Sequence, residues 1–268
     1  MVVSDKEFHI QLNKEDLCGA KYALMPGDPG RVEKIARHLE NPRFLNSNRE
    51  YTSYLGALCG ENVIVMSHGI GGPSTAIAVE ELAALGVKTF IRVGTSGGMQ
   101  PDVLPGDIIN VNGAIRAEGT SKEYVMVEYP AISDFKVTRA IYDAAVALGV
   151  RQHTGVVHCK DSFYGQHSPE RMPVAKELEE KWNAFIKTGA LASEMETATL
   201  FIVCSTLRVR AGAVMLCVWN QMRTQENYKD HGVFDTENAI RVAVEAMKRL
   251  IKDDKEEEGK SFLSLYLT

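Results

Sequence analysis

Three glycine-rich segments among the first hundred residues carry groups that bind small anions. Residues 27–31 follow an apolar run and end in an arginine, and residues 92–98 join an arginine to glycine, threonine and serine. Guanidinium groups and exposed backbone amides both donate hydrogen bonds to anions. Residues 27–31 alone are equally well explained as a Pro/Gly turn beside a solvated arginine. The recurrence of such turns favours one shared anion site that includes Gly27, Arg31, Arg92 and Thr95.

The remaining glycine-rich segment, residues 67–74, joins an apolar run to a helical pattern. Its glycines let a ligand or a neighbouring chain approach the backbone closely. The segment lacks the Gly-Lys-Ser/Thr of a Walker loop, and its glycine spacing does not fit the dinucleotide fingerprint. It therefore predicts neither a nucleoside triphosphate site nor a dinucleotide site.

Two glutamates, Glu194 and Glu196, stand at the start of an apolar helical pattern. A carboxylate can accept hydrogen bonds from the two vicinal hydroxyls of a ribose. The helix dipole also favours acidic residues at this position, and that explanation covers one glutamate equally well. Successive side chains of a helix are rotated by about 100°. We therefore expect the two glutamates to face nearly opposite ways, with at most one of them at a ligand.

The elements that must position these residues follow from the apolar patterns. Short apolar runs predict strands at residues 22–25, 63–67, 89–93, 107–111, 154–158 and 211–218. Helical spacing predicts helices at residues 31–39, 73–85, 135–148, 174–186, 195–207 and 236–251. This alternation predicts a single-domain three-layer α/β/α fold with a mixed central β-sheet flanked by helices. Ligands of such folds bind at the carboxyl ends of the strands.

Composition limits the classes of function. The chain has 268 residues and a formal net charge of -5, which gives no electrostatic reason to bind a nucleic acid polymer. No stretch approaches the roughly 20 apolar residues of a membrane span, and the amino terminus lacks the pattern of a secretory signal. We expect a cytoplasmic protein with no membrane contact. Residues 1–252 form the expected domain, and residues 253–268 a charged, solvated C-terminal tail.

Cysteine and histidine spacing gives no metal motif. The five cysteines are odd in number, and most stand in apolar stretches, so we expect buried free thiols. The seven histidines show no spacing typical of zinc ligands. A zinc site is not expected.

Seven short motifs, taken together in their order and spacing, indicate one protein family. The sequence resembles the nucleoside phosphorylase-I family, most closely its uridine phosphorylase branch, over roughly residues 5 to 252. The resemblance implies a nucleoside phosphorylase-like fold and a pentosyltransferase that uses phosphate to convert uridine into uracil and ribose 1-phosphate, in pyrimidine salvage and catabolism. The motifs that carry it are residues 8–10, 27–31, 48–50, 69–74, 92–97, 161–164 and 194–196.

The resemblance also implies a role for each matching position. Phosphate would be held by Gly27, Arg31, Arg92 and Thr95, with Arg49 reaching in from a neighbouring subunit. Ribose would be held by Met195 and Glu196, with His9 crossing the subunit interface to its 5′-hydroxyl. Phe163 would stack on the base, although a lone phenylalanine is more often a core residue. No cofactor would be required besides phosphate as co-substrate.

Sites shared between subunits would make the protein a self-associating one, by resemblance a homohexamer built from dimers. The same resemblance suggests a monovalent cation such as potassium at the dimer interface, held by Glu50, Ile70 and Ser74. Oxygen ligands suit such a hard cation.

Base preference depends on fewer residues. Purine-cleaving relatives of the hexameric type place an aspartate after a late apolar strand, where this chain has Trp219, Asn220 and Gln221, so a pyrimidine is favoured. The Gln-x-Arg pair typical of uridine phosphorylases is interrupted here. Gln166 and His167 are the candidate base readers, with Lys160 as a cationic substitute and Arg223 as a further candidate; each is also explained as an ordinary loop residue.

Three alternatives stay open at this point. The first is a purine nucleoside phosphorylase on the same scaffold. The second is a nucleosidase that uses water and would need no arginine clamp for phosphate. The third is a non-catalytic nucleoside-binding protein, because a fold does not by itself determine function.

Overall fold

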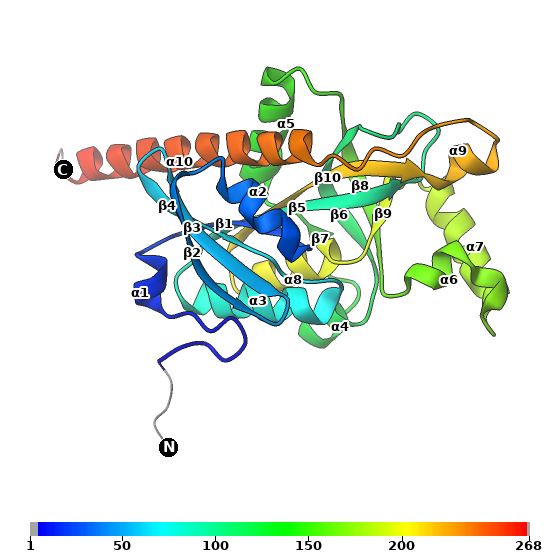
Figure 1. The fold of residues 1–268 in the computed structure, drawn as a ribbon, viewed down its shortest axis with the longest axis horizontal. Coiled ribbons are helices and arrows are strands. Elements are labelled where there is room, and N and C mark those ends of the chain that lie inside the picture. The colour runs from blue at the N-terminus through cyan, green and yellow to red at the C-terminus, as the bar shows by residue number, and fades with distance from the viewer. Residues whose placement is uncertain (1–4, 267–268) are drawn as a thin grey trace.

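A mixed β-sheet forms the centre of the protein in a computed structural model that describes residues 5–266 (Figure 1). Among these residues the sheet has ten strands in the order β10-β6-β8-β9-β5-β1-β4-β3-β2, with β7 beside β6. Because β10 also pairs with β5, strands β10, β6, β8, β9 and β5 close into a ring. The bounds are β1 Tyr22–Pro26, β2 Glu40–Asn48, β3 Tyr51–Leu58, β4 Glu61–Met66, β5 Thr89–Gly98, β6 Ile108–Ala117, β7 Ala131–Ile132, β8 Gln152–Lys160, β9 Ala192–Glu194 and β10 Arg210–Asn220.

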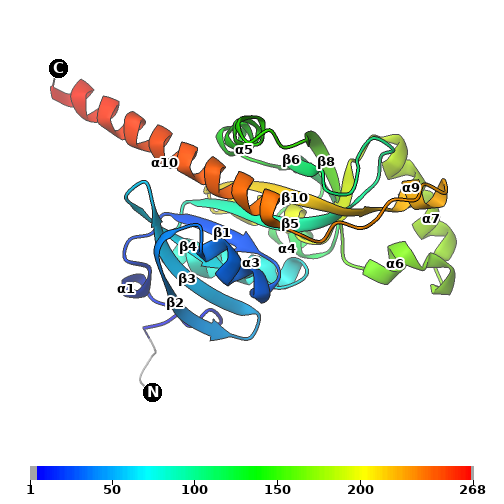
Figure 2. The same ribbon diagram turned by 45° about the horizontal axis from the view of Figure 1, so that its top comes forward.

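Helices cover both faces of the sheet, which confirms the predicted α/β/α layers (Figures 1 and 2). The bounds are α1 Lys14–Leu17, α2 Val32–Ala36, α3 Gly72–Ala84, α4 Thr120–Tyr124, α5 Phe135–Ala147, α6 Phe163–His167, α7 Ala175–Lys187, α8 Thr197–Thr206, α9 Gln221–Gln225 and α10 Glu237–Tyr266. All six predicted strands and all six predicted helices are present, but three of them run well past the predicted ends at residues 93, 111 and 251: β5 ends at Gly98, β6 at Ala117 and α10 at Tyr266. Closure of the ring was not foreseen, because pairing between distant strands leaves no local pattern.

The alternation of side chains along the strands produces two hydrophobic cores. In β1, Ala23 and Met25 pack with α3 and α8 on one face, whereas Tyr22 and Leu24 pack with α2, α5 and α10 on the other. Successive residues of a strand point to opposite faces, so a strand buried on both faces is apolar throughout. This explains why the central strands were readable as continuous apolar runs. The polar strand β2, mostly exposed, was missed for the opposite reason.

The last helix runs through the predicted domain limit at residue 252 and ends at Tyr266. Asp254 forms an ion pair with Arg210 of β10 and accepts a hydrogen bond of 2.9 Å from the Tyr22 hydroxyl. Lys255 donates to the carbonyl of Cys59 at 2.8 Å. At least the first turn beyond residue 252 therefore packs on the body, while the domain limit itself stays a prediction.

The structure also tests the predictions about the cysteines and about membrane spans. All five cysteines are free, and Cys159, Cys204 and Cys217 are buried as predicted. Cys18, by contrast, is exposed at the end of α1, and Cys59 is half-buried, so the expectation of burial was wrong for these two. Within residues 5–266, no helix combines the length and apolar character needed to cross a membrane.

Candidate active site

A cavity of about 850 Å³ opens at the carboxyl ends of β1, β5, β8 and β10, where ligands of such folds bind. Its walls bring together residues that are far apart in the sequence. Most of the predicted site residues line it: Gly27, Arg31, Glu50, Ile70, Arg92, Thr95, Lys160, Phe163, Gln166, His167, Met195 and Glu196.

Two guanidinium groups stand at one end of this cavity. Arg31 donates to the carbonyl of Val93 at 3.3 Å, and its Nε lies 3.7 Å from a carboxylate oxygen of Asp28. Burial lowers the pKa of Arg31, and the like charge of Arg92 lowers it further. Two cations held close together in a partly buried site attract an anion that can neutralise both. This end of the cavity is suited to a phosphate.

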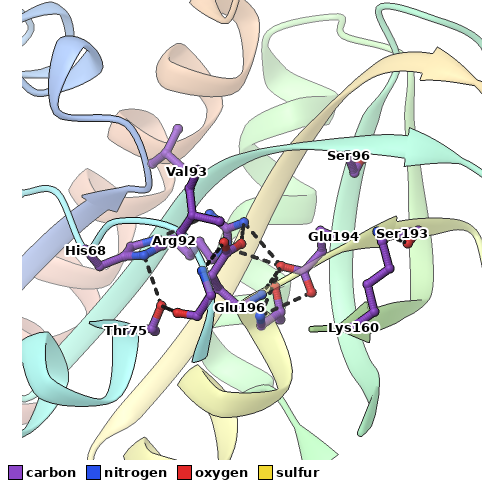
Figure 3. A network of polar contacts seen from close by, with 12 residues as sticks. His68, Thr75, Arg92, Val93, Ser96, Lys160, Ser193, Glu194 and Glu196 are labelled. Atoms are coloured by element: carbon purple, nitrogen blue, oxygen red, sulfur yellow. Dashed lines mark hydrogen bonds and ion pairs between the residues drawn. The ribbon is translucent and has the colours of Figure 1, made fainter. Parts of the chain in front are cut away.

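Arg92 contacts both glutamates, contrary to the expectation that they face opposite ways. Its Nε and Nη2 donate to Glu194 at 3.3 and 3.2 Å, and Nη2 also pairs with Glu196 (Figure 3). Helix α8 includes neither glutamate, although the predicted helix began at residue 195, because β9 ends at Glu194 and α8 begins after Glu196. The rotation of helical side chains therefore does not apply to the pair, and the segment directs both carboxylates to the same guanidinium.

The two carboxylates differ in their surroundings. Burial by itself raises the pKa of Glu194, but Arg92 and backbone N–H groups outweigh it and lower that pKa. Burial raises the pKa of Glu196, and the charge of Glu194 adds to the effect. Glu194 accepts from the N–H groups of Glu196 and Thr197 at about 3.0 Å. It thus holds the turn, which leaves Glu196 as the carboxylate suited to a ligand.

His68 and Thr75, which the sequence did not single out, complete a closed circuit of hydrogen bonds. Arg92 Nη1 donates to His68 Nε2 at 3.3 Å, so the imidazole proton lies on Nδ1 and is donated to the Thr75 hydroxyl at 3.0 Å. Thr75 donates to the Gly71 carbonyl at 3.0 Å, and the Gly71 N–H donates to Glu196 at 2.8 Å. Glu196 pairs with Arg92 and closes the circuit. Every donor in it has an acceptor.

This circuit requires a neutral imidazole. Burial lowers the pKa of His68 well below its usual value, and Arg92 and Arg31 lower it further. A protonated ring would point a second N–H at the Arg92 guanidinium, which has no acceptor. His68 therefore supports Arg92 as a fixed hydrogen-bond acceptor.

The other end of the cavity is aromatic. Phe163, about half exposed, has its ring centroid 4.3 Å from that of His167, which lies 5.8 Å from Trp219. Burial lowers the pKa of His167, and Lys160 lowers it further. An exposed ring at a cavity wall is suited to stacking on a planar base. Lys160 and Gln166 line the same cavity.

Comparison with known proteins agrees with this geometry. The model of the phosphorylase superfamily matches residues 21–253. The chain belongs to this superfamily. The uridine phosphorylase of Treponema pallidum is 58% identical over 94% of this chain and 96% of its own length, and that of Salmonella typhimurium is 43% identical over 91% and 98%. The guanosine phosphorylase of Halorubrum lacusprofundi is 35% identical over 91% and 99%. The family predicted from the motifs is confirmed.

Four of the predicted site residues do not line the cavity: His9, Arg49, Ser74 and Arg223. The ring of His9 contacts Glu81 at 2.6 Å, and Arg49 also lies outside the cavity lining. Their expected role in a neighbouring subunit's site stays a prediction. Arg223 on α9 is held by Asp230 and by the carbonyl of Pro101, so it does not reach the base end. It could read the base only if that ion pair opened.

The segment at residues 94–98 is not the turn that the sequence predicted. Strand β5 continues through Gly98 and pairs with both β10 and β9. The expected anion site at these residues is therefore not built on a turn, and Thr95 lines the cavity from within a strand. A Cβ atom at Gly94 would lie 2.7 Å from Arg92 Nη1 and 2.5 Å from the sulfur of Met215, so a larger residue there would displace the Arg92 guanidinium.

The residues suggested for a monovalent cation lie near one another. The Ser74 hydroxyl is 3.2 Å from the Ile70 carbonyl. A Cβ atom at Gly69 would lie 2.8 Å from Glu50 Cγ and 3.0 Å from the Ser74 hydroxyl, so both side chains flank this glycine. Carboxylate, carbonyl and hydroxyl oxygens fit a hard cation.

Proposed function

We propose that this protein is a uridine phosphorylase that transfers the ribosyl group of uridine to inorganic phosphate and releases uracil. The observation that carries the proposal is one cavity lined by the guanidinium groups of Arg31 and Arg92, by Glu196, which pairs with Arg92, and by the exposed ring of Phe163. The names of the relatives support the choice of uridine. Phosphate, ribose and base each find groups of suitable chemistry in this one cavity.

The residues would act mainly by position and charge. Phosphate would bind to Arg31, Arg92, Thr95 and the Gly27 amide, beneath the anomeric carbon of the nucleoside. As the glycosidic bond breaks, the ribose becomes cationic; phosphate stabilises this cation and then forms the new bond to the anomeric carbon. The bonding electrons leave with the base. No nucleophilic side chain is required, and positioning supplies much of the rate.

Glu196 and Met195 would hold the ribose. In the free protein the Glu196 carboxylate is engaged by Arg92 and the Gly71 N–H. A bound phosphate would compete with Glu196 for the Arg92 guanidinium. The Glu196 oxygens could then accept hydrogen bonds from the ribose hydroxyls. Phosphate and nucleoside binding are then expected to be coupled.

A complete site would require a neighbouring copy of the chain. Arg49 and His9 lie outside the cavity lining, and the adjacent Phe8 and Ile70 are 71% and 79% exposed. These apolar side chains would be covered in a homodimer, three of which would form the hexamer. A potassium ion held by Glu50, Ile70 and Ser74 would join the two subunits of each dimer. We place the enzyme in the cytoplasm and in pyrimidine salvage.

Purine cleavage is the second candidate, favoured by the likeness to a guanosine phosphorylase. The position where purine-cleaving relatives would offer an aspartate holds Asn220. Its Nδ2 donates to the carbonyls of Gln100 and Val103 at 2.8 and 2.7 Å, and its Oδ1 caps α9. Both polar atoms of the Asn220 side chain are therefore engaged in hydrogen bonds within the protein. The side chain also has no carboxylic acid that could protonate a purine, which supports a pyrimidine nucleoside as the substrate.

The test is base release from uridine and from inosine, each with and without inorganic phosphate. Uracil release that requires phosphate is expected. Release without phosphate would indicate a nucleosidase, and cleavage of inosine alone would indicate a purine phosphorylase. No release from either would leave a binding protein.

A further inference from the structure

A chain of hydrogen bonds leads from a buried lysine to the candidate base reader Gln166. Lys160 Nζ lies 2.7 Å from the Ser193 hydroxyl, which lies 2.6 Å from Gln166 Oε1. Gln166 Nε2 then donates to Oε1 of Gln221 at 3.0 Å. These residues come from β8, β9, α6 and α9, so the chain links four elements around the base end of the cavity.

The charge of Lys160 gives this chain a single direction. An ammonium group has three donors and no acceptor, so the Ser193 oxygen must accept from it. The one hydroxyl proton is then donated to Gln166 Oε1, and the amide nitrogen of Gln166 is turned toward Gln221. His158 Nδ1, 3.5 Å from the same hydroxyl, is a longer contact. The orientation of the Gln166 amide thus follows from the lysine.

Burial of the charged Lys160 side chain costs free energy, which indicates that the residue has a role. The residue is only 7% exposed, and its ammonium group donates to the neutral hydroxyl of Ser193 (Figure 3). Burial lowers its pKa, while the charge of Glu194 acts against that effect. Buried lysines are usually paired or functional. An apolar residue of similar length would avoid the cost of burying the charge.

A Gln166 amide fixed in this way would read one pattern of donors and acceptors. Its oxygen keeps a lone pair and its nitrogen keeps a proton beyond those used in the chain. Uracil presents a ring N–H beside a carbonyl oxygen, which match this acceptor and donor. Cytosine presents a bare ring nitrogen beside an amino group, which is the opposite pattern.

We propose that Lys160 and Ser193 are positioning residues that hold the Gln166 amide in the orientation for a base with an N–H next to a carbonyl, and so select uracil over cytosine. The inference rests on the proposed function. A free amide could rotate and pair with either base at similar cost. A fixed one leaves two mismatched polar groups against cytosine, and sites built in this way discriminate strongly.

The test compares phosphate-dependent release of uracil from uridine and of cytosine from cytidine by the full-length protein. We expect Lys160→Met and Ser193→Ala to lower the ratio of kcat/KM for uridine to that for cytidine by about tenfold or more. Lys122→Met is the matched control, because Lys122 lines the neighbouring cavity with Lys160 but has no part in the chain. Its ratio should equal that of the wild type.

The outcomes separate this inference from the function on which it rests. Wild-type release of uracil together with an unchanged ratio in both Lys160→Met and Ser193→Ala would overturn the role of the chain and leave the function in place. No uracil release by the wild type would overturn both. Ser193→Ala removes no buried charge, so it gives a second readout if Lys160→Met does not fold.

Discussion

The closed circuit of hydrogen bonds through His68 and Thr75 predicts that activity falls when the buried Thr75 hydroxyl is replaced by a methyl group. In Thr75→Val the side chain keeps its shape but can no longer accept from His68 Nδ1 or donate to the Gly71 carbonyl, contacts of 3.0 Å each. A buried donor left without a partner costs about 1–3 kcal/mol. If the ring instead shifts its proton to Nε2, it faces Arg92 with a donor, and the guanidinium loses its acceptor.

Either response should loosen Arg92 where phosphate and ribose meet. We expect kcat/KM for uridine to fall by about 5- to 150-fold, the equivalent of about 1–3 kcal/mol, with the larger effect on the phosphate concentration dependence. Steady-state kinetics with varied phosphate, and thermal unfolding of the same samples, give the two quantities.

Thr199→Val is the matched control. Thr199 is also buried, but its hydroxyl donates to Glu118 at 3.0 Å and not into the circuit. This variant should lose stability without a comparable loss of activity. Wild-type kcat/KM in Thr75→Val, or an equal loss in both variants, would refute the positioning role of the circuit.

Three further perturbations have defined outcomes. Glu196→Gln should lower kcat/KM for uridine by about 10- to 150-fold, because hydrogen bonds to a charged group are worth about 1.5–3 kcal/mol. The loss should be smaller for 2′-deoxyuridine. Steady-state kinetics on both nucleosides measure the two losses. Burial lowers the pKa of His158 to about 4, so the unfolded chain takes up a proton below pH 6.5 that the folded one does not, and stability should fall by about 3 kcal/mol from pH 7 to pH 4. Urea unfolding of the wild type and of His158→Phe, in which this contribution is missing, would show it; equal pH slopes would contradict it. Asp254→Ala should cost about 1–2 kcal/mol through the partly buried pair with Arg210, measured by thermal unfolding, and an unchanged melting temperature would mean that the pair is solvent-screened.

Much of the fold was predictable because the apolar patterns are local. Central strands such as β1 are apolar throughout, since helices cover both faces. Helix α3 begins at Gly72 after a glycine of φ +90°, and Pro73 lies in its first turn, a signal that the sequence carries directly. Strand β2 was missed because its side chains are largely exposed, and the short β9 because three residues give no period.

The sequence by itself determined the family and the identity of the groups around the cavity, because motifs such as residues 27–31 lie within a few positions. Only the tertiary structure decided how those groups pair. Arg92 meets Glu194 across 102 positions of sequence, and Lys160 meets Ser193 across 33. Such contacts depend on which strands neighbour each other in the ring. Burial then removes water as a competing partner, so the fold sets which donor meets which acceptor.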